Sequence, residues 1–222
     1  MSVIATRAMG RLASGIRALW RDRRGVALIE FAYILPIFMV LGFSGLELAN
    51  IAITHLRLNQ IAISLADNIS RAKQASITGA PRLREADIND AFIASMRQGA
   101  DMDLQQRGRL VVSSLETNLQ GGQWIHWQRC AGNKAYLPQY GREGDGLIGT
   151  SLTGMGPPNR QVAADAGSAI MFVEVAYDYQ PFLSNMFTSG LEIRKTAAMY
   201  VRDDRDLTQI FNPVPTVIAA RC

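Results

Sequence analysis

The fold of this chain is decided by residues 23–36, which read RRGVALIEFAYILP, and by the apolar run that continues from there to Leu48. The run from Val26 to Leu48 contains no Lys or Arg, and its only charged residues are Glu30 and Glu47. A membrane-spanning helix needs about 20 mostly apolar residues. The 23 residues of this run rise about 34 Å as a helix, at roughly 1.5 Å per residue. The run is therefore long enough to cross the hydrocarbon layer of a bilayer.

The charges around the run predict its orientation. Six arginines precede it with only Asp22 among them, and Arg57 is the first cation that follows. Positively charged residues stay on the cytoplasmic side of a membrane. We therefore expect residues 1–25 to form a cytoplasmic basic leader and residues 26–48 to form the span. A cleaved secretory signal fits less well, because its apolar core is only about 7–15 residues long, and two adjacent arginines are weak evidence for a twin-arginine signal.

Glu30 is the informative residue inside the run. A carboxylate within an apolar segment is costly and usually has a partner or a task. If the chain is cut after Gly25, Val26 becomes its first residue and Glu30 its fifth. This arrangement resembles the processing site of type IV pilin-like proteins, which have Gly before an apolar helix and Glu at the fifth mature position. The TadE-like pseudopilins of tight-adherence (Flp) pilus systems are similar over a longer pattern, Arg24-Gly25, four residues, Glu30-Phe31-Ala32, Pro36 and Glu47.

The resemblance covers residues 23–67 well and implies a function. It implies a minor pseudopilin, or assembly component, that acts in pilus biogenesis and surface adhesion from the bacterial inner membrane, with its larger domain in the periplasm. A prepilin peptidase would cut between Gly25 and Val26. Glu30, Phe31 and Pro36 would then serve assembly with other pilin-like subunits and pilus assembly proteins. Glu30 would neutralise the new amine of Val26, on its own chain or a neighbour; the alternative is a carboxylate that snorkels to the lipid headgroups.

Composition limits the partners of the exported part. The chain of 222 residues has a formal net charge of +4, and six arginines against Asp22 give the leader +5, which leaves −1 for the remainder. A nucleic-acid partner would need a basic stripe, so none is expected. Cys130 and Cys222 both follow the span, where an oxidising compartment allows a disulfide; two free thiols remain the alternative. The sequence contains no CxxC motif or Cys/His cluster, so we expect no metal site.

The helical pattern continues beyond the span, through residues 49–75. Neither Gly nor Pro interrupts residues 46–75, which predicts one helix of about 48 residues, loosened near Pro36. An apolar stripe with helical spacing favours packing against the chain's own sheet. Packing of part of this helix on other pilin-like subunits is also compatible, because further apolar residues lie outside the stripe. The stripe consists of Ile51, Leu58, Ile61, Leu65 and Ile69, and the residues outside it are Ile53, Leu56 and Ile63.

Residues 76–222 predict an α+β domain with an antiparallel sheet, so that the whole chain has a pilin-like architecture. A turn over 76–84 precedes a helix from about Asp87 to Gln98, and strands 110–115 and 123–129 flank a hairpin turn at 118–122. Residues 170–179 and 191–201 alternate with period two, which predicts half-buried strands, with Glu174 facing Arg194. Residues 144–149 match GxGxxG, but they lie within the Gly/Pro-rich connection 131–167 and indicate a surface loop. We expect an extended tail over 211–222.

No catalytic constellation is evident in the sequence. His55 and His126 are the only histidines, and no nucleophile or zinc motif accompanies them. The acidic cluster over 203–206 is interrupted by Arg205, which favours a solvated turn over a cation site. We therefore expect no enzyme, no cofactor and no small-molecule substrate. The alternatives to the pilus function are a single-pass, membrane-anchored periplasmic binding or sensory domain, and a type II secretion pseudopilin.

Overall fold

The computed structural model describes residues 24–74, 79–182, 190–202 and 204–222. The predicted basic leader therefore lies almost entirely outside the described residues, as do residues 75–78 at the expected start of the second domain. The chain divides into two compact units, of which the first ends at Ala49 and the second comprises Asn50–Cys222. Each unit is described by itself below.

One helix, α2 (Arg24–Arg71), has 48 residues and continues through Pro36. The prediction of a single long helix from the apolar run into the following stripe is confirmed. The helix ends a few residues before the expected position because its last turn finds other partners. Ser70 Oγ donates to Asp67 O at 2.8 Å, and Gln74 exchanges backbone hydrogen bonds with Arg82 at 2.8 and 3.1 Å.

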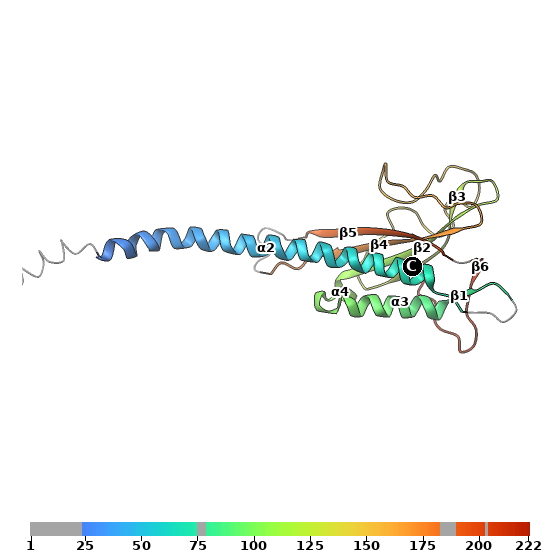
Figure 1. Cartoon of the computed structure of the whole chain (residues 1–222), viewed down its shortest axis with the longest axis horizontal. Coiled ribbons are helices and arrows are strands. Elements are labelled where there is room, and N and C mark those ends of the chain that lie inside the picture. Colours follow the sequence, from blue (N-terminus) through green and yellow to red (C-terminus); the bar gives the residue numbers. More distant parts are fainter. Residues whose placement is uncertain (1–23, 75–78, 183–189, 203) are drawn as a thin grey trace, which may run out of the picture. The chain divides into compact units, whose positions relative to one another are not determined.

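The second unit is built on a four-stranded antiparallel sheet in the order β3-β2-β4-β5 (Figure 1). The predicted hairpin is confirmed, and its strands are longer than expected. The predicted pair at 170–179 and 191–201 is confirmed as well. The strands are β2 (Gly108–Thr117), β3 (Gln123–Ala131), β4 (Ala169–Asp178) and β5 (Glu192–Tyr200).

The helices of the second unit cover one face of the sheet. Leu58, Ile61, Leu65 and Ile69 of α2 are at most 1% exposed and belong to the main core. The prediction that this apolar stripe packs against the chain's own sheet is thus confirmed, with Ile51 partly buried at its edge. From the strands, the same core receives alternate side chains, including Leu110, Val112, Met171, Val173 and Val175.

The opposite face of the sheet carries a second, smaller core. Leu115, Ile125, Ile170 and Phe172 pack there with Met155 and other residues of the long connection between β3 and β4. Strand β4 is consequently buried on both faces from Ala169 to Tyr177, so the expectation of a half-buried strand is wrong for β4. The cause is the connection itself, which covers this face of the sheet.

The remaining elements are short, apart from one helix. The helix α3 (Glu85–Gln98) ends at Gly99, as predicted, and starts two residues before Asp87. Asp87 lies in its first turn, where it accepts the Arg84 backbone N–H at 3.0 Å. The other elements are β1 (Arg82–Arg84), the 3-10 helix η1 (Ala100–Met102), α4 (Leu104–Arg107) and β6 (Asp206–Phe211). Strands β1 and β6 pair in parallel, a pairing that the sequence did not predict.

Candidate functional site

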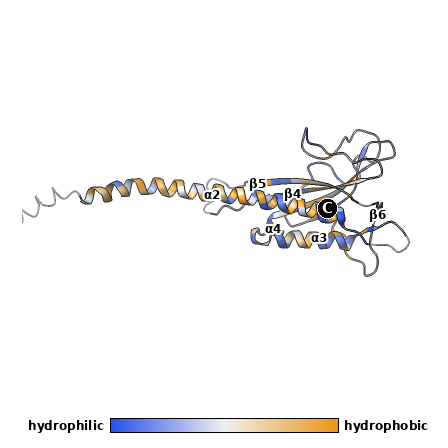
Figure 2. Cartoon of the chain, in the orientation of Figure 1, coloured by the Kyte–Doolittle hydropathy of each residue, from blue (hydrophilic) through white to orange (hydrophobic). Residues whose placement is uncertain are grey.

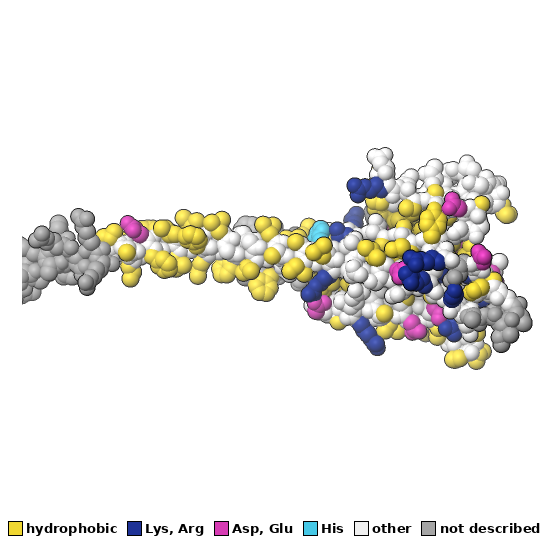
Figure 3. Space-filling model, in the orientation of Figure 1, with side chains coloured by type: hydrophobic (Ala, Val, Ile, Leu, Met, Phe, Trp, Pro, Cys, Tyr) yellow, Lys and Arg dark blue, Asp and Glu magenta, His cyan; other side chains and the backbone are white. Residues whose placement is uncertain are grey.

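The first unit presents an apolar surface on its helix. All of residues 25–46 are exposed. Leu28 is 72% exposed, Tyr33 76% and Phe38 67%. Figures 2 and 3 show hydrophobic residues over this part of α2. A large exposed apolar surface marks a membrane or protein interface, so the start of α2 is the candidate functional site.

This part of α2 is a candidate membrane-spanning helix by its length and composition. Among the described residues, one helix, Gly25–Arg71, is long and apolar enough to cross a membrane. None of its most apolar 18-residue window is buried, whereas the core helix of a soluble protein would be buried. The segment 26–48 that the sequence indicates as a span lies within this helix.

Gly25, Val26 and Glu30 lie in the first two turns of α2. Val26 and Glu30 are four residues apart and therefore share a face of the helix, with an axial separation of about 6 Å. Both are exposed. A Cβ added to Gly25 would have no atom within 4 Å, although Gly costs about 1 kcal/mol relative to Ala in a helix interior. Packing within the described chain thus gives no reason for a glycine at this position.

Phe31 and Pro36 lie on the same exposed segment. Phe31 is 61% exposed and Pro36 is inside α2. Proline has no backbone N–H, so one hydrogen bond of the helix ladder is missing there. Gly42 and Gly45, which the sequence interpretation did not single out, are as open as Gly25, with no atom within 4 Å of an added Cβ. The segment 25–46 thus combines one carboxylate, one missing backbone bond and several open glycines on an apolar surface.

Three apolar residues of α2 in the second unit remain outside the core. Leu56 is 71% exposed, Ile53 50% and Ile63 36%. Their spacing of three and seven residues places them on one side of the helix. These are the residues that the sequence separated from the core-facing stripe. They form a second exposed apolar stripe, to which we refer as the outer stripe.

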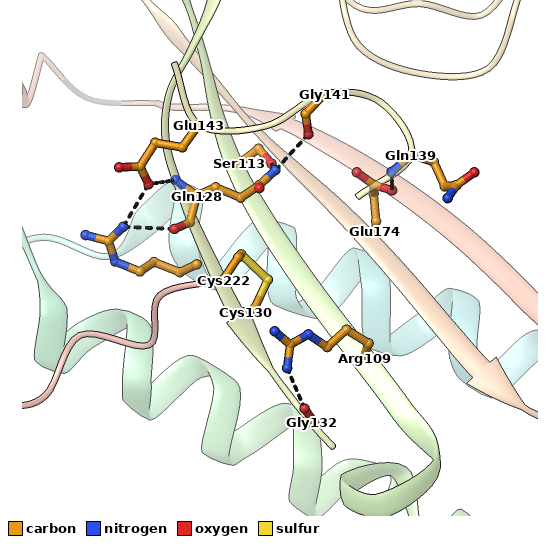
Figure 4. Close-up of a disulfide and its surroundings, with 11 residues drawn as sticks. Arg109, Ser113, Gln128, Cys130, Gly132, Gln139, Gly141, Glu143, Glu174 and Cys222 are labelled. Atoms are coloured by element: carbon orange, nitrogen blue, oxygen red, sulfur yellow. Dashed lines mark hydrogen bonds and ion pairs between the residues drawn. A yellow bond between two sulfur atoms is a disulfide. The ribbon is translucent and has the colours of Figure 1, made fainter. Parts of the chain in front are cut away.

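Cys130 and Cys222, the candidate pair from the sequence, form a disulfide between β3 and the end of the described chain (Figure 4). Polar side chains surround this part of β3. Gln128 donates through Nε2 to Ser113 Oγ at 2.8 Å and to the Gly141 carbonyl at 3.1 Å. The Gln128 backbone N–H donates to Glu143 at 2.9 Å. These bonds tie the long connection to the sheet.

A buried carboxylate lies on the loop-covered face of β4. Glu174 is 1% exposed and accepts hydrogen bonds from Tyr136 Oη at 3.1 Å and from the Gln139 backbone N–H at 2.9 Å. Its other oxygen, Oε1, has no hydrogen-bond partner among the described residues. Burial raises the pKa of Glu174, and the bonds from Gln139 and Tyr136 oppose that shift. Glu174 thus holds the loop at 136–139 on the sheet.

The expectation that Glu174 faces Arg194 is wrong. In the register of β4 and β5, Glu174 is opposite Thr196, while Arg194 is opposite Ala176. Arg194 instead pairs with Glu192 on its own strand. The predicted alternation of the strands was correct, but the predicted pairing was displaced by two residues. A shift of two residues leaves every side chain on the same face of the sheet, so the alternation alone does not reveal it.

His126 lies on the sheet at a β-bulge. Ser114 is opposite Trp127 and Leu115 opposite Ile125, which leaves His126 as the extra residue. Its Nδ1 is 2.9 Å from Glu116 Oε2, and its ring stacks on Trp124 with centroids 4.3 Å apart.

Burial lowers the pKa of the other histidine, His55, and Lys195 adds to that effect. In the part of the chain that the structure describes, no cluster of His, Cys, Asp and Glu could hold a metal ion.

Arg205 is the residue that sequence reasoning misplaced most clearly. The cluster around it was expected to be a solvated turn, yet Arg205 is 6% exposed. Its guanidinium donates to the Ile69 carbonyl at 3.1 Å and also to the Ser70 carbonyl. These carbonyls belong to the last turn of α2, whose C-terminal end lacks backbone donors and favours a cation.

Comparison with protein-family models, with curated proteins and with solved structures finds no match for this chain.

Proposed function

We propose that this chain is a membrane-anchored, pseudopilin-like assembly component of a tight-adherence (Flp) pilus. The observation that carries the proposal is the fully exposed apolar segment 25–46 of α2, with Glu30 on the turn after Gly25 and Val26. Such a surface is unfavourable in water, because contact of apolar area with water costs free energy. A bilayer, and neighbouring helices within it, would cover it.

The position of Glu30 supports a role in assembly. Between Val26 and Leu46, Glu30 is the only charged residue. Cleavage after Gly25 would create an ammonium at Val26, one helical turn from the carboxylate. Each charge needs a partner when it leaves water, because an uncompensated charge in low dielectric is costly. A neighbouring subunit displaced by about 6 Å along the axis, which is four residues of rise, would bring its Glu30 level with this amine.

The second unit supports the same proposal through its construction. Its sheet is covered by helices on one face and by the long connection on the other. The polar contacts described above join the strands to the long connection, as a structural module requires. In this function the first unit is the anchor and assembly helix, the second is a folded periplasmic module, and the prepilin peptidase and pilin-like subunits are the partners.

The cut after Gly25 is the first test. Gly25→Leu has room in the helix, so it should leave the chain folded and inserted but prevent removal of the leader. Gly42→Leu is the matched control, since an added side chain meets no neighbour there either. Intact-mass measurement of the chain from host cells should give a mature chain starting at Val26 for the wild type and the control, and the full-length chain for Gly25→Leu. An unprocessed wild-type chain in peptidase-positive cells would refute the cut.

Glu30→Gln tests the assembly role. The leader should still be removed, because the cut is read at Gly25, whereas surface piliation should fall to the level of a gene deletion. Glu47→Gln, at the other carboxylate of the run, should leave piliation much closer to the wild type. Electron microscopy of pili, with intact mass as the check on processing, provides the readout. Normal piliation by a processed Glu30→Gln chain would show that Glu30 only snorkels to the headgroups.

A further inference from the structure

Residues 220–222 lie at the outer edge of β3, beside Arg129 and Cys130. Strand β3 is at one end of the sheet order, so its outer backbone groups have no partner among the four strands. The Cys130 backbone N–H donates to the Ala220 carbonyl at 2.7 Å, and Arg129 forms an antiparallel bridge with Arg221. A short extended piece of chain therefore takes the place of an additional strand at the Cys130 end of the edge, while the long connection bonds the edge at Ile125 through Gly144 and Asp145. Natural sheets cover such edges to prevent pairing with other chains.

This cover is held by few buried side chains. Val214 is 91% exposed and Ile218 92%, while Ala220 packs partly against the main core. Asn89 Nδ2 donates to the Ile218 carbonyl at 2.9 Å, in an exposed position. The strongest connection is the Cys130–Cys222 disulfide (Figure 4). If that bond opens, the segment loses little apolar burial by leaving the edge.

We propose that the Cys130 end of the outer edge of β3 is a strand-accepting surface, which the segment 217–222 of a second copy of this chain occupies when the disulfide is remade between chains. The occupant follows from the structure, because the edge already binds this segment and Cys130 lies where its cysteine arrives. From Phe211, where β6 ends, 11 residues lead to Cys222, and they extend to about 36 Å at roughly 3.3 Å per residue.

Exchange of this kind requires no new contacts. A swapped segment makes in the neighbour the bonds that it makes in its own chain, so local concentration decides between the two arrangements. The inference does not rest on the proposed function. Any condition that brings copies close together favours the exchanged form.

The covalent step is thiol–disulfide exchange. A glutathione thiolate attacks one sulfur of the Cys130–Cys222 bond, and a second glutathione thiolate resolves the mixed disulfide. Both cysteines are thereby reduced, and the two glutathione molecules are oxidised by two electrons to one disulfide. A small disulfide, such as oxidised glutathione, then accepts two electrons and yields two glutathione thiols as Cys130 of one copy bonds to Cys222 of another.

The experiment mixes ¹⁵N-labelled and unlabelled full-length chains in detergent micelles, in a buffer of reduced and oxidised glutathione. After quenching with acid and digestion, mass spectrometry detects the linked peptide that contains Cys130 and Cys222. Each linked product joins one Cys130 peptide to one Cys222 peptide. We expect the products that join a labelled peptide to an unlabelled one to approach about half of all Cys130–Cys222 products, which is the value for free exchange of one segment between equal populations. Linked peptides that stay isotopically uniform would overturn the proposal, whether the bond stays closed or re-forms within each chain.

Two further readouts separate a seated segment from random collisions. Random oxidation gives Cys130–Cys130 and Cys222–Cys222 links that together equal the mixed pair in amount, and that result would overturn the seating. Hydrogen exchange of the reduced chain should show lost protection at the Cys130 amide and kept protection at Val112 in β2. Loss at both would mean general unfolding and would also contradict the proposal.

A matched pair of variants tests the geometry. Asn89→Ala removes the side-chain bond to the Ile218 carbonyl and should accelerate isotope mixing severalfold. Asn59→Ala, at an exposed asparagine of α2, should leave the rate unchanged. Equal rates for Asn89→Ala and the wild type would show that release of the segment does not pass through the arrangement described here.

Discussion

The guanidinium of Arg129 on β3 and the carboxylate of Glu85 at the start of α3 form an ion pair with an N–O distance of 2.5 Å, and both side chains are 6% exposed. The pair is bidentate, because Arg129 Nε also lies 3.2 and 3.1 Å from the two Glu85 oxygens. Arg129 further donates to the Gln128 carbonyl at 2.8 Å and pairs with Glu143 at 3.3 Å. This pair fixes α3 to the sheet, and the negative charge at the N-terminus of α3 is favourable for the helix.

We expect Glu85→Gln to destabilise the chain by about 3–5 kcal/mol, because it leaves the Arg129 charge buried without its main partner. The double variant Glu85→Leu with Arg129→Met should lose much less, since no buried charge remains. Chemical denaturation in micelles, followed by tryptophan fluorescence, measures both. A double variant as unstable as the single one would mean that the pair itself, rather than the uncompensated charge, carries the stability.

Glu174→Gln should stabilise the chain at pH 7, because the amide removes the buried negative charge and keeps an oxygen that accepts from Tyr136 and Gln139. Burial raises the pKa of Glu174 in the folded state, so the folded chain binds this proton more tightly than the unfolded chain. The favourable contribution is present below the unfolded pKa and is lost as pH rises through the folded pKa. Unfolding from pH 4 to pH 8 should therefore show the two chains converging at acid pH. A variant that is less stable at pH 7 would contradict this account.

Arg205→Met should weaken the end of α2. It removes the side-chain donors to the Ile69 and Ser70 carbonyls; the Ile69 carbonyl keeps the Ala72 N–H, and a buried acceptor left without a partner costs about 1–3 kcal/mol. Arg202→Met is the control, because Arg202 is 57% exposed and its charge lies 3.6 Å from Asp67, an exposed contact worth less than about 1 kcal/mol. Hydrogen exchange at residues 69–72 should accelerate only in Arg205→Met. Equal effects of the two variants would show that Arg205 does not stabilise the C-terminus of α2.

Leu56 belongs to the outer stripe of α2, and Leu58, two residues later, belongs to the core. Leu58 is 0% exposed and Leu56 71%. Leu58→Ala should cost about 2–5 kcal/mol, while Leu56→Ala should change stability by less than about 0.5 kcal/mol. If the outer stripe packs on a neighbouring subunit, Leu56→Ala should still reduce copurification of differently tagged copies from membranes. Full copurification would show that the outer stripe is not an interface.

The second unit also shows where sequence patterns are reliable. The apolar stripe of α2, the hairpin between β2 and β3, and the end of α3 at Gly99 were all predicted, because each depends on residues close together in sequence. The parallel pair of β1 and β6 was missed. Its two strands have only 3 and 6 residues and are far apart in the chain, so neither carries a recognisable period.

The long connection shows the limit most directly. Its glycines and prolines predict a surface loop around 144–149, and nothing local indicates that Met155 is 0% exposed. Met155 is buried because β4 is central and its loop-side residues Ile170 and Phe172 need a cover. Burial on the second face of a strand depends on what lies across from it, which alternation along the strand does not reveal.

The apolar helix, the order of the strands along the chain and the division of the two stripes on α2 all followed from local sequence patterns. Helical and strand periods place side chains on faces without reference to distant residues. The partners of the buried charges, in contrast, became known only from the folded chain. Arg129 and Glu85 are 44 residues apart, Glu174 and Tyr136 are 38 apart, and Arg205 and Ile69 are 136 apart. A buried charge is tolerated only next to a compensating group, and which group that is depends on how the chain folds back on itself.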